Sequence, residues 1–243
     1  MNTDVLQGLK FLWQLVFHEP MEAIDAFFST GFSPDRCRYL VQNDIPVSAL
    51  YWLDCEYEGG KLAYIYAVAT HPDHRGQGLA SRLLEETHKK LKALGYAGAV
   101  LKPAEGLSPF YERLGYVTSG YIRRFAAEQS NTPTPLTVLS AKDYGHLRRS
   151  YLPANAVRQE EETLDFLHTF ANFYACEDAL VCVGKQDPVF FEYLGNPRSA
   201  PGILAALNIK SAEFPTIGNE IPFTMFHPLN CTKIPGYLGI SLE

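Results

Sequence analysis

One stretch of the chain could bind an anion, Arg75-Gly76-Gln77-Gly78-Leu79-Ala80. If it opens a helix, its backbone N–H groups together carry about half a positive charge. Glycines have no Cβ, so an anion such as a pyrophosphate can approach those amides closely. The spacing fits neither the P-loop, G-x-x-x-x-G-K-[ST], nor the dinucleotide fingerprint, G-x-G-x-x-G. A different kind of phosphate site is therefore indicated.

The flanking segments place this stretch between a strand and a helix. Residues 62–70 are mostly apolar, with many aromatic and β-branched side chains, which predicts a buried strand. From Leu79 to Leu94, leucines and alanines recur at helical spacing, and Gly95 follows. The opposite helix face carries charged residues that we expect to be solvated, Glu85, Glu86, Lys89, Lys90 and Lys92.

The same glycine stretch and one later segment carry a resemblance to a known family. Arg75–Ala80 matches R/Q-x-x-G-x-G/A and, after the strand ending at 68–72, resembles the coenzyme A pyrophosphate loop of the GNAT acetyltransferase superfamily. Residues 108–116, Ser-Pro-Phe-Tyr-Glu-Arg-Leu-Gly-Tyr, resemble that family's later F-Y-x-x-x-G-[FY] segment. The alternative is that the glycines serve only the turn.

The resemblance implies acetyl-CoA as the cofactor and identifies the residues that would bind it. The backbone of the central strand would pair with pantetheine along an edge left open where the strand bulges and splays from its neighbour. A backbone N–H near Val68 would polarise the thioester carbonyl. The implied cofactor-binding residues are Val68, Ala69, Thr70, Arg75, Gly76, Gln77, Gly78, Leu79, Ala80 and Ser81.

The same resemblance implies that Tyr111 is the general acid that protonates the departing thiolate. A thiol has a pKa of about 8.5 and a tyrosine about 10, so this proton transfer is only modestly uphill. Tyr111 is one of fourteen tyrosines, and the alternative is simple packing behind Phe110.

The general base is not apparent. An alkyl ammonium has a pKa of about 10.4, so a base or water chain must deprotonate it, or the amine must arrive neutral. Many relatives have a glutamate on the central strand, where this chain has Tyr64, Ile65 and Tyr66. Asp54, Glu56 and Glu58 are more simply edge charges, and His71 and His74 are more simply turn residues. The terminal carboxylate, which some two-domain relatives are thought to use, gives a further hypothesis at Leu242-Glu243.

Composition limits the class of protein. The chain has 243 residues, a formal charge of −6 and five cysteines without C-x-x-C spacing. The negative charge argues against nucleic acid as a partner, and the cysteines fit a reducing cytoplasm better than disulfides or a metal site. Lys10 and Gln14 interrupt the apolar residues near the N-terminus, so we expect no signal peptide. No apolar run reaches the roughly 18 residues of a membrane span.

We expect an α/β protein with a mixed sheet in a GNAT-like core. Residues 1–127 would form the catalytic, acetyl-CoA-binding domain, and the polar, proline-containing residues 128–136 a linker. Residues 137–243 resemble a degenerate second copy without the arginine-glycine loop. There the pattern predicts one helix over 156–174 and a hairpin of 179–183 with 189–194.

The leading functional hypothesis is an acetyl-CoA-dependent N-acetyltransferase that moves an acetyl group directly to a primary amine of a small molecule or peptide, in a ternary complex. The alternatives are a catalytically weak acyl-CoA-binding sensor or scaffold, and a purely structural domain. The negative charge favours a cationic acceptor, and a homodimer is left open. Four aromatic residues suggest either an acceptor wall or core, Tyr51, Trp52, Tyr64 and Tyr66.

Overall fold

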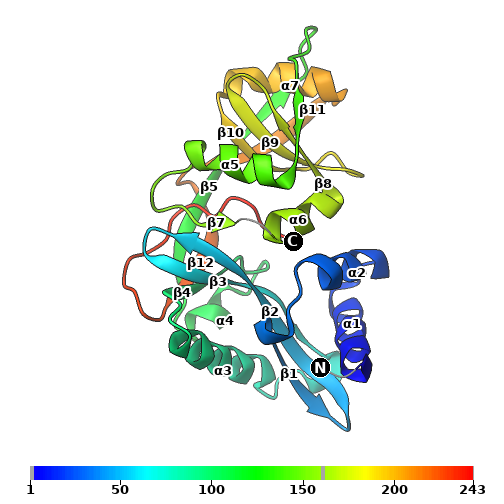
Figure 1. Ribbon diagram of the computed structural model, residues 1–243, viewed down its shortest axis with the longest axis vertical. Coiled ribbons are helices and arrows are strands. Elements are labelled where there is room, and N and C mark those ends of the chain that lie inside the picture. Colours follow the sequence, from blue (N-terminus) through cyan, green and yellow to red (C-terminus); the bar gives the residue numbers. More distant parts are fainter. Residues whose placement is uncertain (1–2, 160–161, 243) are drawn as a thin grey trace. The chain divides into compact units, whose positions relative to one another are not determined.

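A computed structural model describes residues 3–159 and 162–242 of the chain, which forms two compact units (Figure 1). Unit 1 comprises Met1–Val117 and Met225–Ile234, and unit 2 comprises Thr118–Thr224 and Pro235–Glu243. The chain leaves unit 1 within one continuous strand, β5 (Val117–Glu128), whereas the composition of the sequence suggested a boundary near residue 127. A segment from near the C-terminus then returns to unit 1.

Unit 1 is built on a mixed sheet with the order β1-β2-β3-β4-β12. Only β3 and β4 run parallel; the other neighbours in this set are antiparallel. Met225–Pro228 of the returning segment pair with β4 and so extend the sheet. The strands are β1 (Cys37–Gln42), β2 (Ile45–Tyr57), β3 (Gly60–Thr70), β4 (Gly98–Leu101) and β12 (Ile221–Pro228).

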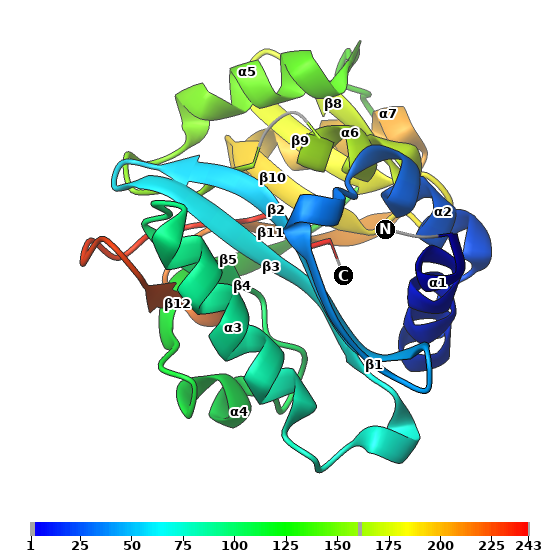
Figure 2. The same ribbon diagram turned by 60° about the horizontal axis from the view of Figure 1, so that its bottom comes forward.

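Helices cover both faces of this sheet, as Figure 2 shows. On one face lie α1 (Thr3–Phe17) and α2 (Met21–Thr30). On the other lie α3 (Leu79–Ala93) and α4 (Ser108–Glu112), whose apolar side chains join an apolar cluster with those of β2, β3 and β4. Two short 3₁₀ helices, η1 (Pro34–Arg36) and η2 (Pro72–His74), precede β1 and follow β3.

The four aromatic residues considered for an acceptor wall are core residues of unit 1, each at most 5% exposed. Tyr51 and Tyr66 lie under α1, where their rings are 5.3 and 5.4 Å from that of Trp13. Trp52 points to the opposite face and joins the α3 cluster. Their burial is explained by packing between the sheet and its helices.

Unit 2 contains a second, antiparallel sheet with the order β10-β9-β8-β6. The predicted hairpin is confirmed as β9 (Ala179–Gly184) and β10 (Phe190–Gly195). The single helix predicted over 156–174 is wrong: the chain forms β7 (Arg158–Gln159), α6 (Glu162–Phe170) and β8 (Ala171–Ala175) there. The remaining elements are β6 (Thr137–Leu139), α5 (Ala141–Tyr151), η3 (Pro197–Ser199), α7 (Ala200–Leu207) and β11 (Ser211–Ile217), which pairs with β5.

A buried polar cluster lies inside unit 2. Glu192 and Arg148 are 0% and 1% exposed and form an ion pair at 2.7 Å. Glu192 also accepts hydrogen bonds from the Tyr144 and Tyr237 hydroxyls at 2.7 and 3.0 Å. Arg148 donates further to Leu238 O at 2.8 Å, so the cluster holds the segment that follows residue 235. Among the described residues, no helix has the length and hydropathy needed to span a membrane.

Candidate functional site

The glycine stretch lies in unit 1 between β3 and α3, where the sequence predicts it. Gly76 and Gly78 have φ angles of +77° and +72°, and a Cβ at either would meet no other atom within 4 Å. Gly78 is the N-cap of α3. These left-handed conformations suit glycine, and they leave the backbone of the turn open to solvent.

The backbone amides of this turn are available to a ligand. The first main-chain hydrogen bond of α3 runs from Arg82 N to Gly78 O at 3.0 Å. Within the described part of the chain, the N–H groups from Gly76 to Ser81 donate to no protein acceptor. No acidic residue lies in the first turn of α3. The row of free amides at a helix start therefore favours an anion.

β3 carries the bulge expected next to this turn. Ala49 pairs with Ala69 and Tyr51 with Tyr66, so Ala67 and Val68 together face a single residue of β2. Ala67 has φ +47°, a rare conformation for alanine that often accompanies functional sites. β4 pairs with β3 only at Leu62–Tyr64, so the two strands separate beyond that point, as predicted.

Two hydrogen bonds to β2 show in which direction the backbone N–H and C=O groups at the end of β3 point. His71 N donates to Val47 O at 2.9 Å, and Ser48 Oγ donates to Ala69 O at 3.0 Å. Because residues alternate along a strand, Thr70 and Val68 present their N–H and C=O groups to the other side. Arg75 Nε reaches Thr70 O there, at 3.4 Å. That edge is available for pairing with an extended ligand.

Tyr111 lies on α4 and is 7% exposed. Its ring packs against those of Phe110 and Tyr116, with centroid distances of 5.0 and 5.6 Å. Val68 packs against the same apolar cluster, so the fold brings the bulged strand and α4 together. Tyr111 therefore packs in the core of unit 1, as the alternative for this residue expected. Its catalytic role stays a prediction.

Two histidines beside Tyr116, the buried His88 and the partly exposed His227, were not singled out from the sequence. His88 of α3 contacts the Tyr116 hydroxyl through Nε2 at 2.8 Å and stacks on His227 of β12 at 4.0 Å. Burial, with His227 alongside, lowers the pKa of His88 to about 3, so this imidazole stays neutral. The position of His88 in the apolar stripe of α3 predicts its burial, but its partner His227 lies too far along the chain to be predicted.

Asp54, one of the carboxylates considered as bases, is already engaged by three neighbouring side chains. Asp54 pairs with Arg36 at 3.3 Å and Lys61 at 2.8 Å, and accepts from the Tyr96 hydroxyl at 2.5 Å. His71 is engaged in its own turn, where Nδ1 accepts from Asp73 N. Glu243 lies outside the described residues.

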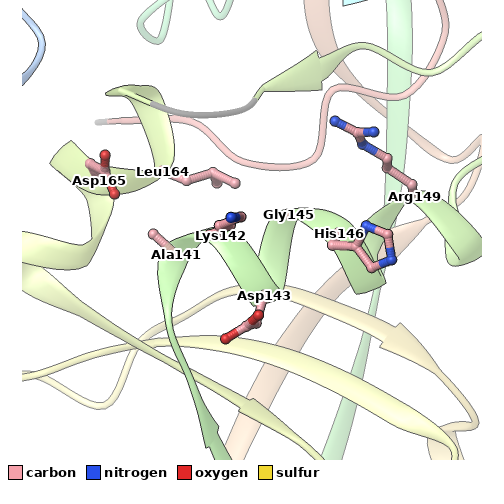
Figure 3. A pocket seen from close by; sticks show the side chains of 8 residues that line it. All are labelled: Ala141, Lys142, Asp143, Gly145, His146, Arg149, Leu164 and Asp165. Atoms are coloured by element: carbon pink, nitrogen blue, oxygen red, sulfur yellow. The ribbon is translucent and has the colours of Figure 1, made fainter.

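Unit 2 has a cavity of about 450 Å³ that involves none of the residues singled out above (Figure 3). Charged side chains of both signs line it, together with the apolar Leu164. Asp143 accepts a hydrogen bond from Ser140 Oγ at 2.7 Å, within the N-terminal cap of α5. The lining residues are Ala141, Lys142, Asp143, Gly145, His146, Arg149, Leu164 and Asp165. Unlike the turn in unit 1, this mixed lining does not select one charge.

Comparisons with known proteins agree with the geometry of unit 1. A family model described as "Acetyltransferase (GNAT) domain" matches residues 1–118, and its match ends one residue beyond the first stretch of unit 1. No curated protein sequence matches the chain.

Solved structures extend the likeness over both units. A GCN5-related N-acetyltransferase from Anabaena variabilis ATCC 29413 aligns with a TM-score of 0.72 and 14% identity, over 94% of this chain and 71% of that one. A GCN5-related N-acetyltransferase from Kribbella flavida aligns at 0.65 and 16%, over 93% and 69%. Eis1 from Mycobacterium abscessus aligns at 0.63 and 11%, over 95% and 73%. At these identities the likeness shows the fold.

Proposed function

Residues 1–118 are a GNAT acetyltransferase domain, and from that premise we propose that the protein is an acetyl-CoA-dependent N-acetyltransferase. It transfers the acetyl group directly to a primary amine of a small molecule or peptide, in a ternary complex. The observation that carries the proposal is the row of free amides from Gly76 to Ser81 at the start of α3. The family's coenzyme contains a pyrophosphate, which such a row would bind.

Three parts of unit 1 would hold the coenzyme. The amides from Gly76 to Ser81 would bind its phosphates, and Arg75 would add a positive charge. The edge of β3 at Val68 and Thr70 would pair with the amides of pantetheine. The bulge at Ala67 supports this assignment, because it accompanies the separation of β3 from β4.

Acetyl-CoA supplies the acetyl group as a reactive thioester. The N–H of Val68 would donate to its carbonyl oxygen and stabilise the negative charge that develops there. Tyr111 would give its hydroxyl proton to the leaving thiolate, and burial among Phe110 and Tyr116 would fix its ring. No carboxylate lies on β3, so the acceptor amine would arrive neutral or lose its proton through water.

Unit 2 would be a degenerate second copy of the acetyltransferase core, with a structural role and without a coenzyme site. Both units contain a strand followed by a proline-containing 3₁₀ turn. His71 Nδ1 accepts from Asp73 N in unit 1, and Asn196 Oδ1 accepts from Arg198 N in unit 2. In unit 2, however, α7 begins directly after η3, without an intervening glycine turn.

The runner-up function is an acyl-CoA-binding sensor with little turnover. The observation that favours it concerns Asp54 of β2, the acidic residue of that strand that lies closest in register to the bulge of β3. Asp54 already pairs with Arg36 and Lys61, so it is not free to act as the general base.

Calorimetric titration of acetyl-CoA, followed by thiol release with a panel of primary amines, tests both functions. Saturable binding with amine-dependent thiol release supports the enzyme. Binding without release by any amine would favour the sensor. Absence of binding would contradict both, and would leave the glycines with a role in the turn only.

Replacing Tyr111 by phenylalanine tests its role as the acid. We expect kcat to fall about 100-fold, because the ring keeps its packing and only the proton donor is lost. The Kd for acetyl-CoA, measured by calorimetry, should not change. Tyr121→Phe, at a tyrosine that is 38% exposed on β5, is the control. An unchanged kcat in Tyr111→Phe would mean that this residue has only a packing role.

A further inference from the structure

One buried hydroxyl group in unit 1 lies beside the bulge of β3. Ser48 of β2 is 0% exposed, and it interrupts a run of apolar and aromatic residues, Val47–Leu53. Packing alone would favour an apolar side chain at this position, because a buried hydroxyl costs free energy unless it forms hydrogen bonds. The hydrogen bonds of Ser48 therefore indicate what this residue does.

Ser48 binds two consecutive residues of β3. Its hydroxyl donates to Ala69 O at 3.0 Å, and its Oγ lies 2.9 Å from Thr70 Oγ1. A serine hydroxyl has a single proton, so while Ser48 donates to Ala69 O, the other hydrogen bond is donated by Thr70. The two hydroxyls and the carbonyl thus form one directed chain, which holds the end of β3 from the side of β2.

The hydrogen bond to Ala69 O lies where the regular pairing of β2 and β3 ends. Ala69 faces Ala49 in the last regular pair before the bulge, and the register shifts between Ala49 and Tyr51. A bulge disrupts the ladder of main-chain hydrogen bonds around it. The Ser48 hydroxyl adds a side-chain hydrogen bond at the point where this ladder is interrupted.

The planarity of the peptide group carries the effect of this hydrogen bond to the open edge of β3. The C=O of Ala69 and the N–H of Thr70 belong to the same planar trans peptide group and point in opposite directions. A hydroxyl that holds Ala69 O toward β2 therefore holds Thr70 N–H toward the other side. On that side Arg75 Nε, from the glycine stretch, reaches Thr70 O at 3.4 Å. Ser48 thus sets the direction of a backbone donor beside the glycine turn.

We propose that Ser48 is a positioning residue for the coenzyme: without touching it, Ser48 aligns the Thr70 N–H with a carbonyl group of pantetheine. This inference rests on the proposed function, which assigns pantetheine to the edge of β3. A donor that is already aligned loses little conformational freedom when a ligand binds, whereas a mobile donor must be ordered at that moment. The Ser48 hydroxyl therefore raises the affinity for acetyl-CoA.

Replacing Ser48 by alanine tests this role. The substitution removes the hydroxyl and keeps a small side chain among apolar neighbours. We expect the Kd for acetyl-CoA, measured by calorimetric titration, to rise about 5-fold, which is the effect of one typical hydrogen bond. A rise of less than about 2-fold in Ser48→Ala, with normal binding by the wild type, would overturn the proposal and leave the proposed function intact. Absence of binding by the wild type would contradict the proposed function itself.

Thr87→Val is the matched control. Thr87 of α3 is also 0% exposed, and its hydroxyl also donates to a main-chain carbonyl, Leu83 O, at 2.7 Å. Its hydrogen bond lies within α3 and does not involve β3. Thr87→Val should therefore keep the wild-type Kd for acetyl-CoA. An equal rise of the Kd in Thr87→Val and Ser48→Ala would overturn the proposal, because the cause would then be a general loss of stability.

A measurement on the free protein tests the alignment without any coenzyme. In ¹⁵N relaxation experiments we expect the Thr70 amide to have the order parameter of rigid backbone, about 0.85, in the wild type and in Thr87→Val. In Ser48→Ala this order parameter should fall. A Thr70 amide that is as rigid in Ser48→Ala as in the wild type would overturn the proposal, whatever the calorimetry gives.

Discussion

Replacing Gly78 by tryptophan is expected to weaken acetyl-CoA binding by at least about 100-fold, which corresponds to roughly 2.8 kcal/mol. Gly78 is the N-cap of α3, at the centre of the free amides from Gly76 to Ser81. An indole there would occupy the space that a phosphate needs. Because a Cβ at Gly78 meets no atom within 4 Å, the side chain projects into the binding space and does not collide with the fold. Calorimetric titration measures the change.

Gly95 offers a matched control at the other end of α3. It also has a positive φ, +82°, and a Cβ there also meets nothing within 4 Å. Either tryptophan variant incurs the strain of a side chain in the left-handed region, about 1–2 kcal/mol. Gly95→Trp should therefore lose stability to the same extent and keep its affinity. Equal loss of binding in both variants would mean that the effect comes from a weakened helix and not from a blocked site.

Replacing Glu192 by glutamine is expected to destabilise the protein by about 3–5 kcal/mol. Glu192 is fully buried and is the acceptor for Arg148, Tyr144 and Tyr237. The substitution keeps the size of the side chain but leaves the Arg148 guanidinium in the interior without its counter-charge. Urea unfolding, followed by circular dichroism, gives the difference in the free energy of unfolding.

The exposed pair Arg124–Glu213 in unit 2 is the control. Its N–O distance is also 2.7 Å, but the two side chains are 49% and 55% exposed. Solvent screens such a pair, so Glu213→Gln should change stability by no more than about 1 kcal/mol. A loss in Glu192→Gln as small as that in Glu213→Gln would show that burial adds nothing to the ion pair.

The parts of the fold that could be predicted are those whose signals are local. The strand predicted from residue 62 is observed as Gly60–Thr70, and the helix predicted from Leu79 is observed as Leu79–Ala93. Apolar spacing and the two glycines sufficed for both. The helix predicted over 156–174 failed because the apolar residues of a short helix and the following strand merge into one pattern.

Features that depend on distant segments could not be predicted. The strand β12 pairs with β4, which lies more than a hundred residues earlier in the sequence, and no local pattern predicts that pairing. For the same reason His227 could not be placed beside His88. In the candidate site, the turn followed from its glycines, whereas the engagement of Asp54 by Arg36, Lys61 and Tyr96 depends on three separate segments of the chain.

The return of Met225–Ile234 to unit 1 has a consequence for protein synthesis. When the ribosome has made residues 1–117, β4 still lacks its partner β12, and its edge is a template for pairing with other chains. Unit 1 can complete its sheet only after residue 228 has emerged, by which time all of β5 to β11 has been translated. Unit 1 therefore cannot finish folding before most of unit 2 has been translated.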